Sequence, residues 1–227
     1  MLRALYLILT LMGVLPLMNM VMAAETTPPT KILVWGDSLS AAYGIPVDKG
    51  WVNLLQQKLQ NNAVINNGSI SGETTAGGLT RLPAALQTYQ PDYVLLELGA
   101  NDGLRGIKTD TMQANLEQMI QLAQQAKAKV VLLGIKLPPN YGSAYTQKFE
   151  AVYTNLAKQY NLPLVPFLLD GIAQNWDLVQ ADGVHPTAAA QPMVLDNVWK
   201  VLQSVLPTNI AASTTNTTSA PAATVTQ

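Results

Sequence analysis

Short apolar runs alternate along this chain with longer stretches in which apolar residues recur every three or four positions. The short runs predict strands at 31–36, 63–67, 92–98, 129–135 and 162–167. The longer stretches predict helices that begin near residues 51, 75, 110, 143 and 187. Such alternation is typical of a parallel sheet with helices on both faces. We therefore expect an α/β fold with three layers, α/β/α, around a flavodoxin-like sheet of about five strands.

The first predicted strand leads to a serine at the edge where parallel sheets bind their ligands. Apolar residues 32–35 run directly into Gly36, Asp37 and Ser38. A continuous apolar run predicts a strand that is buried on both faces, and ligands bind beyond the carboxyl ends of such strands. Gly36 permits a sharp turn at that point. Ser38 is therefore a candidate nucleophile, if the chain also supplies a base that can activate its hydroxyl.

The chain contains one histidine, His185, so one imidazole is available as that base. Asp182 precedes it by three residues, and Gly183 allows a tight bend between them. The carboxylate can thereby reach the second ring nitrogen, fix the tautomer of the imidazole and stabilise its charged form. On the residues alone, a loop histidine that is hydrogen-bonded for local order remains the alternative.

Two further residues are candidates for the oxyanion hole that acyl transfer requires. Gly72 and Asn101 follow the second and third predicted strands, which neighbour the first strand in a sheet of this kind. Gly72 offers a backbone amide that a substrate can approach closely, and Asn101 offers a side-chain amide. Taken singly, each residue is also explained by an ordinary turn or loop.

Composition and charge narrow the choice of partners and cofactors. The 227 residues carry 13 Lys and Arg against 14 Asp and Glu, a net charge of −1, and no basic run is visible. Nucleic acid is therefore not expected as a partner. The absence of cysteine excludes a thiol nucleophile, a disulfide framework and a lipid-modified cysteine. Because there is also a single histidine, we expect no zinc site of nitrogen and sulfur ligands, no other metal and no cofactor.

The two ends of the chain differ in character from the part between them. Residues 1–24 combine Arg3, an apolar stretch at 5–17 and a cleavage-like site at 21–23, which is typical of a secretory signal peptide. An uncleaved anchor is the alternative. The protein is then periplasmic or secreted, with no membrane span once the signal is removed. After the signal we expect a short linker at 25–30, a folded domain at 31–207 and a flexible Ala/Thr/Ser-rich tail at 208–227.

The combination of these residues is more specific than any one of them. The blocks occur in the order Gly36-Asp37-Ser38-Leu39, Gly72, Gly99-x-Asn101-Asp102 and Asp182-x-x-His185. In this order they resemble the SGNH hydrolases, also called the GDSL family. Longer stretches, among them 69–73, 97–106 and 137–142, resemble the branch of periplasmic multifunctional thioesterases, lysophospholipases and arylesterases. The resemblance covers about residues 31–206.

The resemblance implies the SGNH hydrolase fold and a serine esterase or thioesterase that works through an acyl-enzyme. Ser38 would be the nucleophile, His185 the general base and then acid, and Asp182 the residue that orients His185. The backbone N–H groups of Ser38 and Gly72 and the side chain of Asn101 would form the oxyanion hole. Acyl-CoA, lysophospholipids and aryl esters would be substrates, and the expected partners are therefore small acyl esters and thioesters. We also expect a monomer.

Two loops resemble those beside the acyl groove of this family. They supply the candidate substrate-binding residues Leu104, Arg105, Ile107, Pro138 and Tyr141. A role as plain surface loops weighs about equally for these residues.

Two other functions stay open. A carbohydrate acetyl-esterase would share the chemistry but take a different substrate. A non-catalytic α/β ligand-binding protein would use the glycine-rich strand ends to hold a small molecule. The chain has neither a G-x-G-x-x-G run nor a phosphate-binding lysine motif, which weakens the second alternative.

Overall fold

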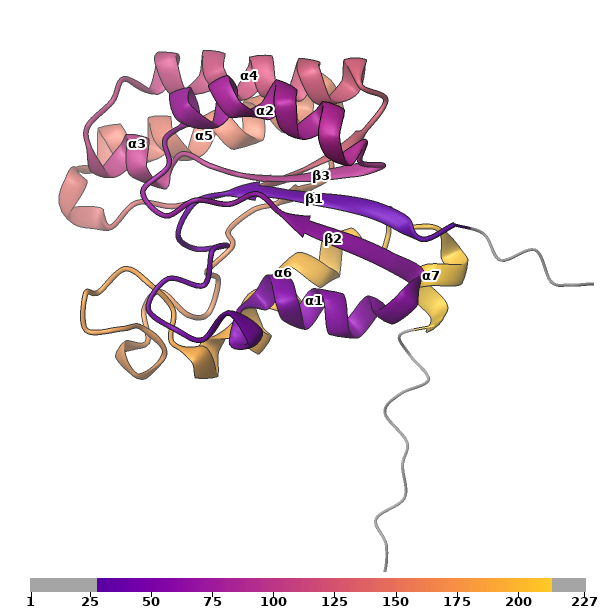
Figure 1. The fold of residues 1–227 in the computed structure, drawn as a ribbon. Helices are drawn as coiled ribbons and strands as arrows, with labels where there is room; N and C mark the ends of the chain where they lie inside the picture. Colours follow the sequence, from indigo (N-terminus) through magenta and orange to yellow (C-terminus); the bar gives the residue numbers. More distant parts are fainter. Residues whose placement is uncertain (1–27, 214–227) are drawn as a thin grey trace, which may run out of the picture.

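The computed structural model describes residues 28–213, which form a parallel sheet between two layers of helices (Figure 1). Its strands are β1 (Thr30–Gly36), β2 (Ala63–Asn67), β3 (Tyr93–Glu97), β4 (Lys129–Leu133) and β5 (Leu164–Val165). They lie in the order β2-β1-β3-β4-β5, and each neighbouring pair is parallel. The expected three-layer α/β fold with about five strands is confirmed.

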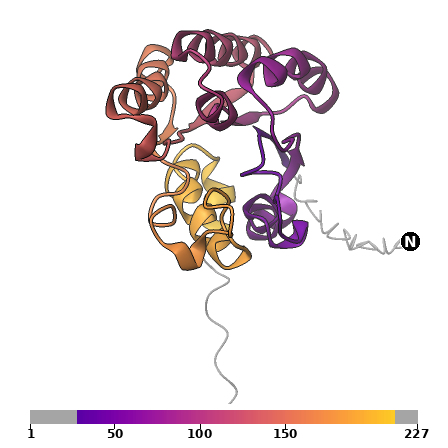
Figure 2. The same cartoon turned by 90° about the vertical axis from the view of Figure 1, so that its left-hand side faces the viewer.

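Helices cover both faces of this sheet. Figure 1 shows α1 (Trp51–Leu59) and α6 (Gln191–Leu202) on one face, and α2 (Thr75–Tyr89), α4 (Thr109–Gln125) and α5 (Ser143–Tyr160) on the other. The turned view in Figure 2 separates the same two groups of helices. Shorter elements are α3 (Ala100–Leu104), α7 (Thr208–Ser213) and the 3-10 turns η1 (Val47–Lys49), η2 (Gln60–Asn62), η3 (Pro139–Tyr141), η4 (Trp176–Leu178) and η5 (Ala188–Ala190).

The central strands are buried on both faces, as their continuous apolar runs predict. Residues 32–35 of β1 are at most 2% exposed, and every residue of β3 is buried. β2 lies at the edge of the sheet, where Val64 is 45% exposed. The same core continues into the helices through large side chains such as Trp51 and Phe149. The loops that follow β1 and β3 therefore start from rigid, close-packed strands.

Prolines shift two element boundaries relative to the sequence pattern. The fifth strand is predicted at 162–167, but β5 pairs with β4 only through Leu164 and Val165. Pro163 and Pro166 flank this pair, and proline has no N–H to donate to a ladder. The last helix, predicted to begin near 187, opens with the η5 turn, and α6 then has Pro192 in its first turn.

The ends of the described region refine the expected segments. The first residues of the predicted tail form α7, and Ile210 of this helix is 4% exposed and belongs to the hydrophobic core. The ordered part therefore extends beyond the boundary expected at 207, because one apolar side chain in a polar segment finds a place in the core. The predicted signal at 1–24 and residues 214–227 lie outside the described residues.

The strand order places three loops next to one another. β1 lies between β2 and β3, with Val34 opposite Asn67 and Gly36 opposite Glu97. Because all carboxyl ends of parallel strands share one edge, the loops that carry Ser38, Gly72 and Asn101 converge there. Among residues 28–213, the helices are all too short or too polar to cross a membrane.

Candidate active site

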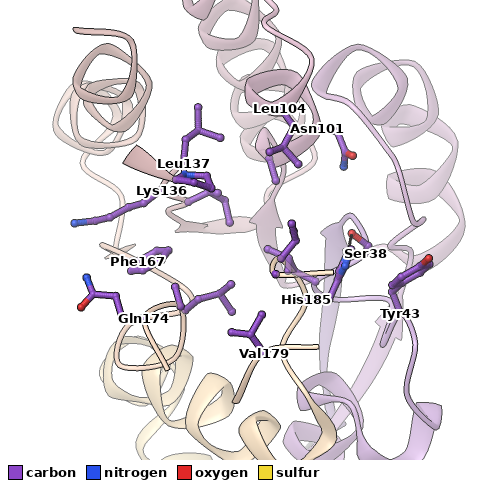
Figure 3. A pocket seen from close by; sticks show the side chains of 18 of the residues that line it. Ser38, Tyr43, Asn101, Leu104, Lys136, Leu137, Phe167, Gln174, Val179 and His185 are labelled. Carbon is purple, nitrogen blue, oxygen red and sulfur yellow. Dashed lines mark hydrogen bonds between the residues drawn. The ribbon is translucent and has the colours of Figure 1, made fainter. Parts of the chain in front are cut away.

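Ser38, His185 and Asp182 form a continuous chain of hydrogen bonds. Ser38 Oγ lies 2.8 Å from His185 Nε2, and His185 Nδ1 lies 2.7 Å from Asp182 Oδ2. Figure 3 shows Ser38 and His185 side by side at one end of a cavity. A serine hydroxyl in this arrangement faces a base whose other nitrogen is held by a carboxylate, which is the geometry that activates a nucleophile.

A tight turn places His185 in this chain. Asp182 Oδ1 accepts hydrogen bonds from the backbone N–H groups of Val184, at 2.9 Å, and His185, at 3.0 Å. Gly183 between them has φ +71°, which favours glycine. Partial burial acts to raise the pKa of Asp182, but these hydrogen bonds and the imidazole outweigh it and hold the pKa below its ordinary value. Asp182 therefore stays charged at neutral pH.

The turn after β1 rests on two buried carboxyl groups. Asp37 Oδ1 accepts from the N–H of Leu39 at 3.0 Å, which closes the turn around Ser38. Glu97 Oε2, at the end of β3, accepts from the Ser40 hydroxyl at 2.7 Å and from the N–H of Asp37 at 3.2 Å. Ser40 is 2% exposed and committed to Glu97, so Ser38 is the serine of this turn that faces the cavity.

These two carboxyl groups are fully buried, and burial changes their protonation. Burial raises the pKa of Asp37 to about 7. Burial, and then the charge of neighbouring Asp37, raise the pKa of Glu97 well above its ordinary value. Glu97 therefore keeps its proton to a higher pH than an exposed carboxyl group does, and two adjacent buried charges are disfavoured.

Both predicted oxyanion donors line the same cavity as Ser38. Gly72 follows β2 with φ +80°, and Arg105 Nη2 donates to its carbonyl at 2.9 Å, which sets the orientation of this loop. Asn101 lies in α3, where its Nδ2 donates to Asp37 Oδ2 at 3.1 Å and to the Glu73 carbonyl at 2.9 Å. The structure thus brings together five side chains or backbone groups that the sequence spreads over about 150 residues.

A largely apolar cavity of about 600 Å³ extends from the Ser38 hydroxyl. In Figure 3, Ser38 and His185 lie on one side of this cavity, and Lys136, Phe167 and Gln174 lie on the other. The apolar part of the wall includes Leu104, Ile135, Leu137, Pro138, Phe167, Leu169, Ala173 and Val179. A cavity of this volume and polarity can hold an apolar group of a ligand beside the hydroxyl.

The predicted substrate-binding residues divide into two groups. Leu104 and Pro138 line the cavity. The remaining three do not belong to its lining: Arg105 contacts the Gly72 carbonyl, Tyr141 donates to the Leu104 carbonyl at 3.4 Å, and the Ile107 carbonyl accepts from Tyr145 at 2.9 Å. Their contacts shape the loops around the cavity, and direct substrate contact remains a prediction for all five.

Sequence reasoning missed most of the apolar wall and one aromatic neighbour of the imidazole. Ile135 and Leu137 follow β4, and Phe167 and Leu169 follow β5. The signal that could have found them is position, since these segments leave the same edge of the sheet as Ser38. The ring of Tyr43 lies 4.5 Å from the His185 ring, centroid to centroid, and no sequence signal pointed to this contact.

The described residues contain no group of three or more His, Cys, Asp or Glu side chains that could hold a metal ion. The groups that surround Ser38 are a base, a carboxylate behind it, and N–H donors beside it. Together these can form and break an acyl ester of the serine.

Comparison with known proteins identifies the family of this chain. The model of the GDSL-like lipase/acylhydrolase family matches residues 34–191, which span Ser38, Gly72, Asn101 and His185. The chain belongs to the GDSL-like lipase/acylhydrolase family. This GDSL family member is an enzyme, a serine hydrolase of the SGNH type.

Relatives within the GDSL family are similar over most of their length. The chain is 48% identical to Esterase TesA of Pseudomonas aeruginosa over 82% of this chain and 94% of the relative. It is 42% identical to Thioesterase 1/protease 1/lysophospholipase L1 of Escherichia coli over 77% of this chain and 84% of the relative. The crystal structure of the esterase EstA from Pseudoalteromonas sp., inhibited by monoethylphosphonate, matches with a TM-score of 0.74 at 44% identity, covering 77% of this chain and 97% of EstA.

Proposed function

We propose that this protein hydrolyses fatty-acyl esters and thioesters through an acyl-enzyme on Ser38. The observation that carries the proposal is the hydrogen-bonded chain from Ser38 through His185 to Asp182, which opens on an apolar cavity of about 600 Å³. The names of the relatives, an esterase and a thioesterase/lysophospholipase, support the same substrate classes. Acyl-CoA, lysophospholipids and aryl esters are the proposed substrates.

The first half of the reaction transfers the acyl group to the enzyme. Ser38 Oγ attacks the carbonyl carbon while His185 Nε2 takes the hydroxyl proton, and Asp182 stabilises the resulting imidazolium. The negative charge on the carbonyl oxygen is met by the N–H groups of Ser38 and Gly72 and by the amide of Asn101. His185 then gives its proton to the departing alcohol or thiol as the carbon–oxygen or carbon–sulfur bond breaks.

The second half repeats these roles with water as the nucleophile. His185 takes a proton from water, the hydroxide forms a bond to the acyl carbon, and the ester bond to Ser38 Oγ breaks. Ser38 recovers its proton from His185, and a carboxylic acid leaves. Each proton that His185 accepts is returned, so the enzyme ends in its starting state.

The apolar wall favours a fatty-acyl group over the acetyl group of the alternative sugar esterase. An acetyl group would leave most of the cavity unfilled, whereas a longer chain removes more apolar surface from water, at about 0.8 kcal/mol per buried CH₂. Relative turnover of p-nitrophenyl esters from C4 to C16 against acetylated sugars separates the two functions. Preferential turnover of the sugars would refute the fatty-acyl proposal.

We also propose that residues 1–24 export the protein to the periplasm or beyond the cell. The positive start, apolar stretch and small residues of this segment support the proposal. The test is the mass of the protein recovered from the periplasmic fraction or the medium: loss of the first residues up to about position 24 is expected. Retention of the intact chain in the membrane fraction would identify an anchor instead.

The chemistry is tested by labelling the intact protein with a fluorophosphonate and mapping the adduct by mass spectrometry. We expect the adduct on Ser38, and we expect Ser38→Ala to lose both the label and ester hydrolysis. Ser71→Ala is a matched control, because Ser71 lines the same cavity while the ring nitrogens of His185 are hydrogen-bonded to Ser38 and Asp182. It should keep the label. An adduct on another residue, or hydrolysis by Ser38→Ala, would overturn the proposal.

A further inference from the structure

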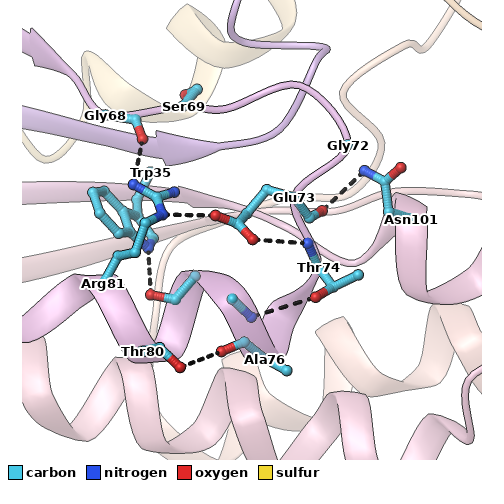
Figure 4. Close-up of polar contacts among 12 residues, drawn as sticks. Trp35, Gly68, Ser69, Gly72, Glu73, Thr74, Ala76, Thr80, Arg81 and Asn101 are labelled. Carbon is cyan, nitrogen blue, oxygen red and sulfur yellow. Dashed lines mark hydrogen bonds and ion pairs between the residues drawn. The ribbon is translucent and has the colours of Figure 1, made fainter.

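One arginine outside the cavity connects three segments that support the oxyanion hole. Arg81, on α2, donates through Nε to Glu73 Oε2 at 2.6 Å and through Nη1 to the Gly68 carbonyl at 3.2 Å (Figure 4). Its guanidinium also lies 4.2 Å from the ring centroid of Trp35, on β1. Arg81 thereby ties the strand that leads to Ser38 to the loop that leads to Gly72.

Glu73 is held in a single position by its surroundings. Its side chain is 13% exposed, and its second oxygen, Oε1, accepts from the N–H of Thr74 at 3.2 Å. A side chain at Gly77, one turn into α2, would collide with this carboxylate. The glycine at 77 therefore makes room for Glu73 between the loop and the helix.

The backbone of Glu73 reaches both oxyanion donors outside the nucleophile turn. Gly72 is the preceding residue, and the Glu73 carbonyl accepts from Asn101 Nδ2 at 2.9 Å. The second amide hydrogen of Asn101 goes to Asp37 Oδ2. The orientation of this amide is thus set before substrate arrives, and a substrate oxyanion would share hydrogens that Glu73 and Asp37 hold in place.

We propose that Arg81 and Glu73 are positioning residues of the oxyanion hole, an inference that rests on the proposed function. Neither side chain lines the cavity, so both act through Gly72 and Asn101. Oxyanion donors stabilise the transition state when they are fixed about 2.7–3.1 Å from the developing charge. A displacement of about 1 Å can lower the rate by about 10²-fold.

Three variants test the ion pair against one matched control. Arg81→Ala removes the pair, Glu73→Gln keeps the shape of the side chain but places an amide against a donor, and Arg81→Lys keeps the charge without the planar fork. Glu117→Gln is the control, because Glu117 accepts hydrogen bonds from Gln159 and Tyr160 between α4 and α5, away from the cavity.

We expect Arg81→Ala to lower kcat by about 10- to 100-fold and to change KM by less than about threefold. Glu73→Gln should show a similar split, and Arg81→Lys should restore part of the loss. The double variant Arg81→Ala/Glu73→Gln should lose little more than Arg81→Ala alone, because the two residues act as a unit. Glu117→Gln should keep kcat within about twofold, since its contacts bear on folding alone.

A transition-state analogue separates positioning from general loss of structure. An alkylboronic acid forms a tetrahedral adduct with a serine, and the adduct places an oxygen in the oxyanion hole. Its inhibition constant should rise in proportion to the loss of kcat in each variant, whereas the inhibition constant of a fatty-acid product should stay within about threefold. If Arg81→Ala does not fold, Glu73→Gln and Arg81→Lys carry the same test.

The inference is overturned if kcat stays within about twofold of the wild type, or if kcat falls while boronate inhibition is unchanged. These outcomes differ from failure of the proposed function, which appears in the wild-type protein itself. A wild type that takes no fluorophosphonate at Ser38 refutes the proposed function. A wild type that is labelled, with variants that are equally active, refutes the positioning role alone.

Discussion

Two aspartates serve the surroundings of Ser38 from opposite environments. Asp182 lies on a loop with its side chain 38% exposed, whereas Asp37 is fully buried beneath the nucleophile turn beside Glu97. Hydrogen bonds from N–H groups hold the pKa of Asp182 low, although burial opposes them, and burial raises the pKa of Asp37 to about 7. Near neutral pH, the outer carboxylate, Asp182, is charged, whereas the inner one, Asp37, is only partly charged.

This difference matches what each region has to do. In the proposed reaction, His185 gains and loses a proton in each half, and the negative charge of Asp182 would stabilise its imidazolium. Beneath Ser38, no proton has to move, and Asp37 and Glu97 fix backbone N–H groups, the Ser40 hydroxyl and Asn101. We therefore propose that Asp37 and Glu97 contribute geometry to the site, and that Asp182 contributes charge.

The largest expected effect comes from removing the outer charge. Asp182→Asn should lower kcat by about 10³-fold or more, because an amide holds the imidazole in the wrong tautomer and does not stabilise its charged form. Steady-state kinetics on a p-nitrophenyl ester measure the loss. Asp177→Asn, an exposed aspartate on the same loop region, should leave kcat unchanged. A loss in kcat of less than about tenfold for Asp182→Asn would mean that the charge of Asp182 does not stabilise the imidazolium of His185.

A smaller loss is expected from Asp37→Asn. The new amide can accept from Leu39 or face Asn101 with its oxygen, but it cannot do both, so one hydrogen bond of the site is lost. We expect kcat to fall by about tenfold, because the amide of Asn101 is displaced. KM should stay nearly constant, because the apolar cavity beside Ser38 keeps its shape. Equal losses of kcat in Asp37→Asn and Asp182→Asn would contradict the proposal that Asp37 contributes geometry and Asp182 contributes charge.

The pH dependence of stability distinguishes the same two aspartates. Between about pH 4 and the raised pKa of about 7, folded Asp37 holds a proton that the unfolded chain has lost. Because the folded state binds more protons, the free energy of unfolding falls as pH rises through this range. The lowered pKa of Asp182 has the opposite sign: its contribution is present at neutral pH and is lost as pH falls below its unfolded value.

Denaturant unfolding at several pH values checks this sign. In Asp37→Asn, the decline in stability between about pH 5 and 7 should become shallower, because one of the two buried titrating groups is gone. Asp182→Asn should leave the slope in that range unchanged and weaken the loss of stability in acid. A wild-type protein that grows more stable from pH 5 to 7 would contradict the assignment of a proton to the buried pair.

The turn that brings Asp182 to His185 was predictable from the sequence, whereas the contact between Asp37 and Glu97 was not. Asp182, Gly183 and His185 are neighbours in the chain, so their spacing and one glycine predict a turn that brings carboxylate to imidazole. The contact of Asp37 with Glu97 depends on the register of β1 against β3, which apolar periodicity does not report.

The walls of the cavity were also only partly predictable from the sequence. Sequence patterns predicted which strands end beside Ser38, and the parallel order confirmed it. They did not predict that Phe167 and Leu169, after a strand shortened by two prolines, complete an apolar cavity. They also did not connect Arg81 to Glu73, because a side-chain pair between a loop and a helix leaves no period in the sequence.

The smallest effect is expected for Glu97→Gln, which tests whether Glu97 contributes hydrogen-bond geometry without a charge. The new amide would keep an oxygen to accept from Ser40 and from the N–H of Asp37, and it resembles the uncharged form that burial favours in Glu97. We expect kcat within about threefold of the wild type, since the positions of the acceptor and of the turn are retained. Glu97→Leu, in contrast, leaves both donors buried without an acceptor and should destabilise the fold by about 1–3 kcal/mol for each. A large loss of kcat in Glu97→Gln with normal stability would mean that a charge on Glu97 takes part in the reaction.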